Sequence, residues 1–209
     1  MSELILPHFV PHDRKDLDSI LHRPMFTEPQ GRSIPFLTYG NWKDNQFEFI
    51  RTESLDRSPD EIHAKAMKNL LNFSPETKLI GKDKTKMIAS VLRTAPEKIL
   101  DENYMNDLAF TLKCQNLIVA IPSSVMLYAV PADNTEALMC MASVASIFPK
   151  DSPDFILTKR LFCVANGKIS FAMDTLVDEV PTPSSMVQEY LGRKQAEESK
   201  KSFWERLFG

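Results

Sequence analysis

Residues 155–173 read FILTKRLFCVANGKISFAM, two β-rich runs on either side of Asn166-Gly167. Both central positions of a two-residue hairpin turn require a positive φ, and asparagine and glycine tolerate that conformation at little cost. The stretch therefore predicts two antiparallel strands joined by a tight turn. A sheet that contains this hairpin is expected to be built from further hairpins.

Two other segments of the chain favour hairpins. In residues 34–52, the runs IPFLTYG and QFEFIRT flank the turn-rich NWKDN, and phenylalanines alternate with Glu48. Such alternation is typical of a strand with one buried face and one face in water. TKLIGKD at 77–83 and KMIASVLRT at 86–94 are interpreted as a further hairpin, although the spacing of the second run also fits a helix.

Two neighbouring runs are apolar at almost every position. They are NLIVAIP at 116–122 and VMLYAVP at 125–131. Continuous apolarity over so few residues indicates strands that are covered on both faces.

The helices are predicted from caps and from apolar residues at helical spacing. In SPDEIHAKAMKNLLNF, Ser58 and Glu61 form a capping box around Pro59, which starts a helix over 59–73. Further helices are expected over 134–148, over 95–114 with an interruption near Asp101, and, as a short one, over 13–22.

These elements predict an α+β fold, because hairpins and helices come in blocks rather than in strict βαβ alternation. The expected architecture is a mostly antiparallel sheet built from the hairpins at 34–52 and 155–173 and the pair at 117–130. The helices at 59–73 and 134–148 are expected to pack on one face of it. Residues 1–180 are predicted to form a single α+β domain, and 181–209 a Pro-rich linker with a C-terminal amphipathic helical tail.

The composition excludes several classes of partner. The chain has 209 residues, a hydrophobic content of 43% and a formal net charge of -3, and its basic residues are scattered. Nucleic-acid binding is therefore not expected. No run approaches the roughly 20 apolar residues of a membrane-spanning helix, so we expect no integral membrane association and a cytoplasmic location. The three cysteines are far apart, and we expect buried reduced thiols.

His63 stands out because it lies where the helix should be apolar. A rotation of 100° per residue places it within the arc of apolar side chains that includes Ile62, Ala66 and Leu70. A buried imidazole without a partner costs about 1–3 kcal/mol. We therefore expect either a core histidine bonded to the backbone or to a side chain, or a residue that faces a pocket. Asn69, at the edge of the same arc, is expected to tie the helix to a neighbouring segment.

The stretches EIHAKAMKNLL, LIVAIPSSVMLYAVP and EALMCMASVASIF together resemble the uncharacterised bacterial family typified by YtpQ. The resemblance covers about residues 58–173, and the matching positions are His63, Asn69, Pro122 and Ser123. It implies an α+β cytoplasmic protein with no established activity, and it makes these four residues a candidate functional surface. The family pattern often has Arg-Asp after Pro-Ser, whereas this chain has Ser124-Val125.

No complete catalytic or metal-binding motif is present. Ser123 lacks the GxSxG elbow of serine hydrolases, and the four histidines are dispersed along the chain. His8 and His12 are four residues apart, but Pro7 and Pro11 break the helix that would align them. Phosphate-binding glycine motifs are also missing. We therefore predict no catalytic, cofactor-binding or metal-binding residues, and no cofactor.

The C-terminal KKSFWERLFG is the most suggestive exposed segment. On a helix, its large apolar side chains cluster, and they form a candidate partner-docking patch: Phe203, Trp204, Leu207 and Phe208. Folding back on the domain, docking in a groove of a partner and resting on a membrane surface remain open as alternatives.

The function that these observations favour is a non-catalytic cytoplasmic protein-binding or adaptor module that uses a sheet face or the aromatic tail. The alternative is an enzyme with an unrecognised site near His63 and the Pro122-Ser123 turn, in which a carboxylate such as Asp101, Glu102 or Asp107 would lie beside the histidine. A structural subunit that forms a homo-oligomer is a third possibility.

Overall fold

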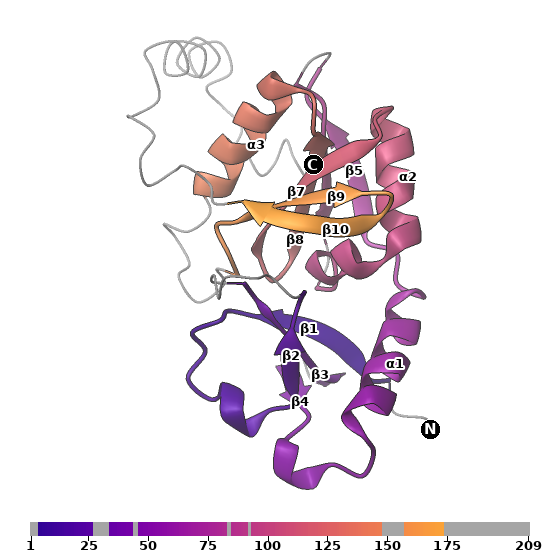
Figure 1. Ribbon diagram of the computed structural model, residues 1–209, viewed down its shortest axis with the longest axis vertical. Helices are drawn as coiled ribbons and strands as arrows, with labels where there is room; N and C mark the ends of the chain where they lie inside the picture. Colours follow the sequence, from indigo (N-terminus) through magenta and orange to yellow (C-terminus); the bar gives the residue numbers. More distant parts are fainter. Residues whose placement is uncertain are drawn as a thin grey trace. The chain divides into compact units, whose positions relative to one another are not determined.

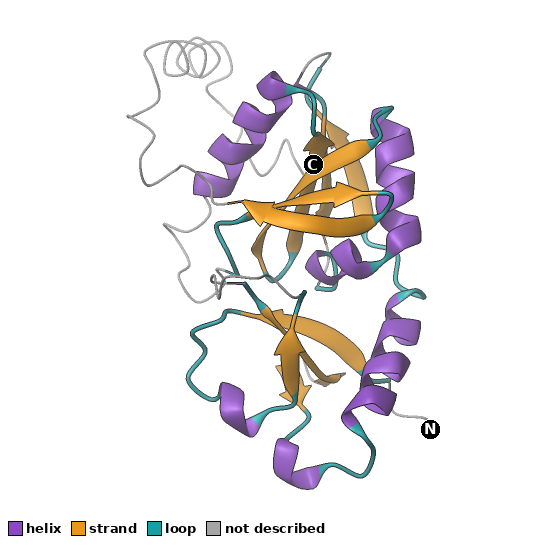
Figure 2. Cartoon of the chain, viewed as in Figure 1, coloured by secondary structure: helices purple, strands orange, loops and turns teal. Residues whose placement is uncertain are grey.

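The computed structural model describes residues 4–26, 34–43, 46–82, 85–91, 93–147 and 157–173. They belong to the first of two units into which the chain divides, Met1–Thr175 and Leu176–Gly209. The second unit lies outside the described residues, and so do the predicted docking residues Phe203, Trp204, Leu207 and Phe208. Figures 1 and 2 show the described part as strands and helices that form an α+β fold, as predicted.

The strands of the described residues form a four-stranded and a six-stranded sheet, both antiparallel. In chain order, the elements are β1 (Leu6–Val10), η1 (Leu17–Ser19), β2 (His22–Pro24), β3 (Phe36–Lys43), β4 (Gln46–Phe49), η2 (Thr52–Ser54), α1 (Pro59–Leu70), β5 (Glu76–Ile80), β6 (Met87–Val91), η4 (Pro96–Leu100), α2 (Glu102–Leu112), β7 (Asn116–Ser123), β8 (Met126–Pro131), α3 (Thr135–Ile147), β9 (Leu161–Ala165) and β10 (Lys168–Met173).

The six-stranded sheet has the order β10-β9-β7-β8-β6-β5. Its hairpins confirm the predictions: β9 and β10 turn at Asn166 and Gly167, whose φ angles are 50° and 76°. β5 pairs with β6, so the ambiguous run at 86–94 contributes a strand rather than a helix. β7 and β8 are adjacent and buried along nearly their whole length, as their continuous apolarity predicted.

The helices at 59–73 and 134–148 were expected to pack on one face of a single sheet, and this expectation is wrong, because α1 packs on the four-stranded sheet and α3 on the six-stranded sheet. Leu117 and Val119 of β7 pack in one core cluster with Met105 of α2. Ile118, the residue between them, packs in a second cluster with Met141 of α3. Alternate residues of a strand point to opposite faces, so α2 and α3 cover opposite faces of this sheet (Figure 1). Strands that are apolar on both faces require this arrangement.

The predicted hairpin at 34–52 belongs to the separate four-stranded sheet, which has the order β1-β3-β2 with β4 also paired to β3. α1 packs on this sheet, and Ile62 and Ala66 share a core cluster with Phe9 and Tyr39. The predicted capping box is present, because Glu61 N donates to Ser58 Oγ at 3.3 Å and Ser58 N donates to Glu61 Oε2 at 3.0 Å.

The predicted helix over 13–22 is reduced to one short turn, Leu17–Ser19. Strand pairing takes the residues that follow it: Ile20 forms a bridge to Arg51, and His22–Pro24 pairs with β3. Tertiary pairing has here overridden a weak local preference for helix.

η4 connects the core to both α1 and β1. Lys98 is buried, and its ammonium group donates to the carbonyl of Leu70 at 3.3 Å and pairs with Asp101. Asp101 also caps α2 by accepting from the backbone N–H groups of Asn103 and Tyr104. The predicted interruption near Asp101 is therefore confirmed as the boundary between η4 and α2.

Candidate functional site

His63 lies on the side of α1 that faces the four-stranded sheet, and it is half-buried. Its Nδ1 atom is 2.9 Å from the hydroxyl oxygen of Tyr39 in β3, and the two rings meet edge to face at 5.8 Å. Among the described residues, this contact gives the imidazole a side-chain partner. It also ties the helix to the central strand of the sheet.

The charge state of this pair follows from its burial. Burial lowers the pKa of His63, the cation of Arg23 lowers it further, and Asp60 opposes both. Burial also raises the pKa of Tyr39, so the phenol keeps its proton and can donate it to an unprotonated Nδ1. Asp60 is thus the carboxylate whose charge affects the pKa of His63, and it pairs with Arg23 at 2.9 Å.

Asn69 lies on the same helix and contacts the residue that precedes β1. Its side-chain Nδ2 donates to the carbonyl of Ile5 at 2.7 Å. His63 and Asn69 together therefore fix α1 to β3 and to the chain that enters β1.

Pro122 and Ser123 lie elsewhere, at the end of β7 in the six-stranded sheet. The ladder between β7 and β8 shifts its register between Ala120 and Ser123, and the carbonyl of Pro122 accepts from Leu157 N at 3.1 Å. The hydroxyl of Ser123 is buried and has no hydrogen-bond partner within the described residues. No hydrogen bond between described residues joins this segment to His63.

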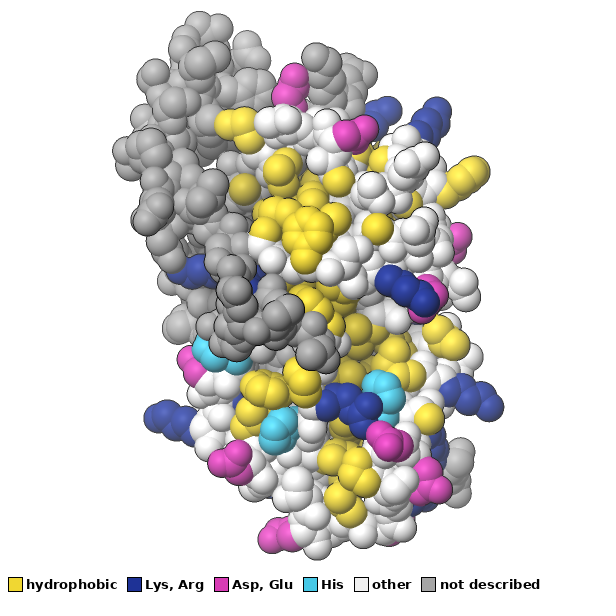
Figure 3. Space-filling model, viewed as in Figure 1, with side chains coloured by type: hydrophobic (Ala, Val, Ile, Leu, Met, Phe, Trp, Pro, Cys, Tyr) yellow, Lys and Arg dark blue, Asp and Glu magenta, His cyan; other side chains and the backbone are white. Residues whose placement is uncertain are grey.

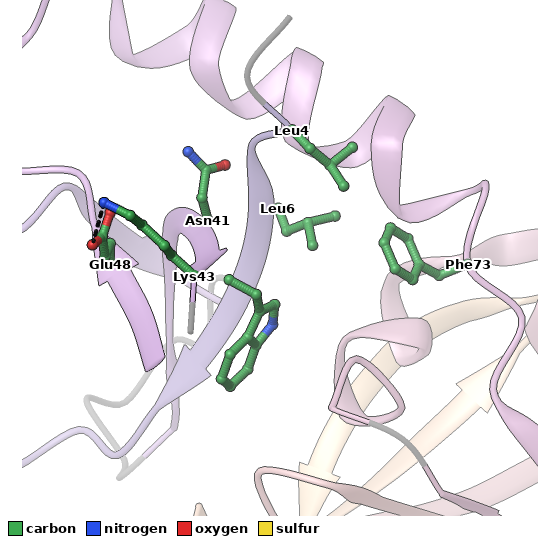
Figure 4. A pocket seen from close by; sticks show the side chains of 7 residues that line it. Leu4, Leu6, Asn41, Lys43, Glu48 and Phe73 are labelled. Atoms are coloured by element: carbon green, nitrogen blue, oxygen red, sulfur yellow. Dashed lines mark ion pairs between the residues drawn. The ribbon is translucent and has the colours of Figure 1, made fainter. Parts of the chain in front are cut away.

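A pocket of about 530 Å³ opens where β1 begins and where β3, β4 and α1 end. Its apolar wall consists of Leu4, Leu6, Trp42 and Phe73, and its polar rim of Asn41, Lys43 and Glu48. Figure 4 shows the two leucines between Phe73 on one side and the Lys43–Glu48 ion pair on the other. The volume lies within the range of about 300–1,000 Å³ that is usual for ligand pockets.

Trp42 also belongs to a row of rings on the four-stranded sheet, which we call the aromatic cluster: His8, Trp42, Phe47 and Phe49. Neighbouring rings lie 4.5–5.7 Å apart, a spacing at which aromatic pairs attract. Figure 3 shows hydrophobic and histidine side chains side by side over the region of β1–β4.

Each end of the aromatic cluster carries a guanidinium group. Arg14 lies 4.2 Å from the centroid of the Phe49 ring, and Arg93 lies 4.5 Å from that of the Trp42 ring. Both distances lie within the roughly 6 Å at which the face of an aromatic ring attracts a cation.

A buried carboxylate contacts the aromatic cluster through His8. Glu97 of η4 has no exposed surface, and its Oε1 atom accepts from the backbone N–H of Phe9 at 2.7 Å and lies 3.1 Å from Nδ1 of His8. Because this N–H donates to Glu97 rather than to β3, it lies at the outer edge of β1. Glu97 therefore satisfies one backbone donor at that edge and orients the His8 ring.

The polar groups of the pocket lining are one amide and one ion pair. The residues that line the described pocket include no histidine, cysteine or serine. Burial raises the pKa values of the Cys114 and Cys163 thiols, which disfavours their nucleophilic thiolate forms. Across the described residues, no three histidine, cysteine, aspartate or glutamate side chains gather in a group that could hold a metal ion.

Sequence reasoning missed the pocket. The alternation in QFEFIRT had indicated a half-buried hairpin, but the position of Leu4 and Phe73 beside that hairpin depends on tertiary structure.

The helices of the described residues include none that is long and apolar enough to cross a membrane. No protein-family model, curated protein or solved structure matches the chain.

Proposed function

We propose that this protein is a non-catalytic peptide-binding module, an adaptor that takes an apolar side chain of a partner protein into the pocket beside Trp42. The observation that carries the proposal is the composition of the pocket, in which four large apolar residues form the wall and an ion pair forms the rim. Apolar pockets with a few polar groups that fix orientation are typical of binding sites. A cytoplasmic location, and kinship with the family typified by YtpQ, belong to the same proposal.

The anchoring of the pocket walls supports this function. Leu4 and Leu6 flank Ile5, which Asn69 holds by its carbonyl, and Asn41 and Trp42 follow Tyr39, which contacts His63. A pocket whose walls are held in place loses less conformational entropy when a ligand binds. In this proposal, His63 and Asn69 position the site without lining it.

A peptide selection with a matched pair of variants tests the proposal. Peptides are first selected from a random displayed library for binding to the whole chain. They are then titrated against the parent protein and against the variants Leu4→Asp and Leu79→Asp. Leu4 in the pocket wall and Leu79 in β5 are similarly exposed, at 51% and 53%. We expect Leu4→Asp to weaken binding about tenfold or more and Leu79→Asp to leave it unchanged.

The tryptophans offer a direct readout, because the chain has two, Trp42 and Trp204. In a Trp204→Phe background, Trp42 is the single indole reporter, and a peptide in the pocket is expected to shift its emission to shorter wavelength. Equal affinities of the two Leu→Asp variants, or binding without any change in Trp42 emission, would show that peptides bind elsewhere. Leu4→Ala, a milder change, separates loss of the pocket surface from any effect of Leu4→Asp on folding.

A further inference from the structure

β3 extends past the beginning of β1 at the pocket. The ladder between the two strands ends at the pair Leu6–Gly40, whereas β3 continues beyond Gly40. Leu4 precedes β1, is 51% exposed and lines the pocket. Between Leu4 and Leu6, the carbonyl of Ile5 accepts from Asn69 of α1. The pocket therefore opens where the chain that enters β1 separates from β3.

The residues of β3 that line the pocket point to both faces of the sheet. Asn41, Trp42 and Lys43 follow one another, and all three line the pocket. Successive side chains of a strand lie on opposite faces, so a pocket that all three reach lies along an edge of the strand. One edge of this part of β3 is paired with β4. The pocket therefore lies along the other edge, which β1 covers only as far as Leu6.

The backbone of Trp42 points to that open edge. Tyr39 accepts from the N–H of Ile50 at 2.8 Å, so Tyr39 and every second residue after it direct their backbone groups toward β4. Gly40 and Trp42 direct theirs toward the side of β1, where the ladder reaches Gly40 and stops. No hydrogen bond within the described residues takes up the N–H or the C=O of Trp42.

We propose that the partner segment binds as an extended strand, which pairs with Trp42 at the open edge of β3 while one of its apolar side chains enters the pocket. This inference rests on the proposed function, because it names the form in which the partner occupies the same pocket. An added strand supplies the donor and the acceptor that the backbone of Trp42 lacks. A helix bonds its own backbone groups internally and offers no such match.

The pairing also decides which partner side chain enters the pocket. Residues that lie opposite each other in neighbouring strands share a face of the sheet. Leu6, opposite Gly40, therefore lies on the same face as Trp42. The partner residue opposite Trp42 places its side chain on this face, between Trp42 and Leu6, and this is the apolar residue.

Amide hydrogen exchange, followed by NMR on the whole chain, tests the pairing directly. The Gly40 amide is the matched control, because it is paired with β1 in the free protein. We expect the Trp42 amide to exchange about tenfold or more faster than that of Gly40, and to slow by about tenfold or more when a selected peptide saturates the protein. Slow exchange at Trp42 in the free protein would show that another segment already occupies the edge, and would overturn the inference.

A scan of the selected peptide with N-methylated residues provides a second test. Each N-methyl group removes one backbone donor and leaves every side chain in place. We expect one position to weaken binding about fivefold or more. Its two neighbours should change binding less than about twofold, because their N–H groups point away from β3.

The outcomes separate this inference from the proposed function. If Leu4→Asp weakens the peptide but the Trp42 amide gains no protection, or adjacent N-methyl groups act equally, the extended strand is wrong and the peptide-binding function stands. If no selected peptide is weakened by Leu4→Asp, both proposals fall.

Discussion

Replacing Glu97 with alanine is expected to destabilise the protein strongly. The carboxylate has no exposed surface and accepts two contacts, the N–H of Phe9 at 2.7 Å and the ring of His8 at 3.1 Å. The alanine variant leaves the N–H of Phe9 without its acceptor and the ring of His8, which is only 12% exposed, without its partner. Each unsatisfied group costs about 1–3 kcal/mol, so we expect a total loss of about 3–5 kcal/mol.

The loss can be measured by urea unfolding at neutral pH, followed by far-UV circular dichroism. With a denaturant dependence of about 2–3 kcal/mol per molar urea, the midpoint is expected to fall by about 1–2 M. Glu97→Gln retains an oxygen acceptor of similar shape and should lose less than half as much. Glu102→Ala is the matched control, because Glu102 is 57% exposed and pairs only at the surface with Lys168.

A loss below about 1 kcal/mol for Glu97→Ala would refute the reasoning, because it would mean that water or another group satisfies Phe9 and His8 equally well. Equal losses for the alanine and glutamine variants would refute a different step, namely that an acceptor at this position matters more than packing.

Two further predictions concern the sheet that forms the pocket. Gly40→Ala is expected to cost about 3 kcal/mol or more in urea unfolding, because the added Cβ would lie 2.1 Å from the carbonyl oxygen of Glu48, and a loss under about 1 kcal/mol would contradict the observed strand spacing. The folded protein holds the pKa of His63 below its value of about 6.5 in the unfolded chain, so the unfolded chain binds more protons below that pH and stability falls as the solution is acidified. His63→Gln should therefore lose less unfolding free energy than the parent between pH 7.5 and pH 5.5, and identical losses would exclude this contribution.

Local signals predicted most of the elements. The Asn166-Gly167 turn, the Ser58 capping box and the interruption at Asp101 each depend on a few adjacent residues, and each is present. These features are decided by backbone conformation and by short-range hydrogen bonds. They need no knowledge of the rest of the chain.

The errors arose where distant segments compete. β1 was not predicted, because Pro7 and Pro11 were considered only as residues that break a helix, yet β1 is an edge strand, where proline is tolerated. The division into two sheets and the placement of α2 and α3 on opposite faces depend on which strands pair. One clue was available: β7 is apolar at successive positions, which already requires cover on both faces.

The candidate residues show how far sequence reasoning reached toward a site. A search for polar side chains in apolar positions found His63 and Asn69, and both make long-range contacts to the strands that carry the pocket walls. Such a search detects groups that need a partner, and a partner in another element makes them anchors. The apolar residues that line the pocket are leucine, tryptophan and phenylalanine at ordinary apolar positions, so nothing local distinguishes them from core residues. A binding surface of this type is therefore recognised from the anchors that hold it and from the rim charges that tertiary structure brings together.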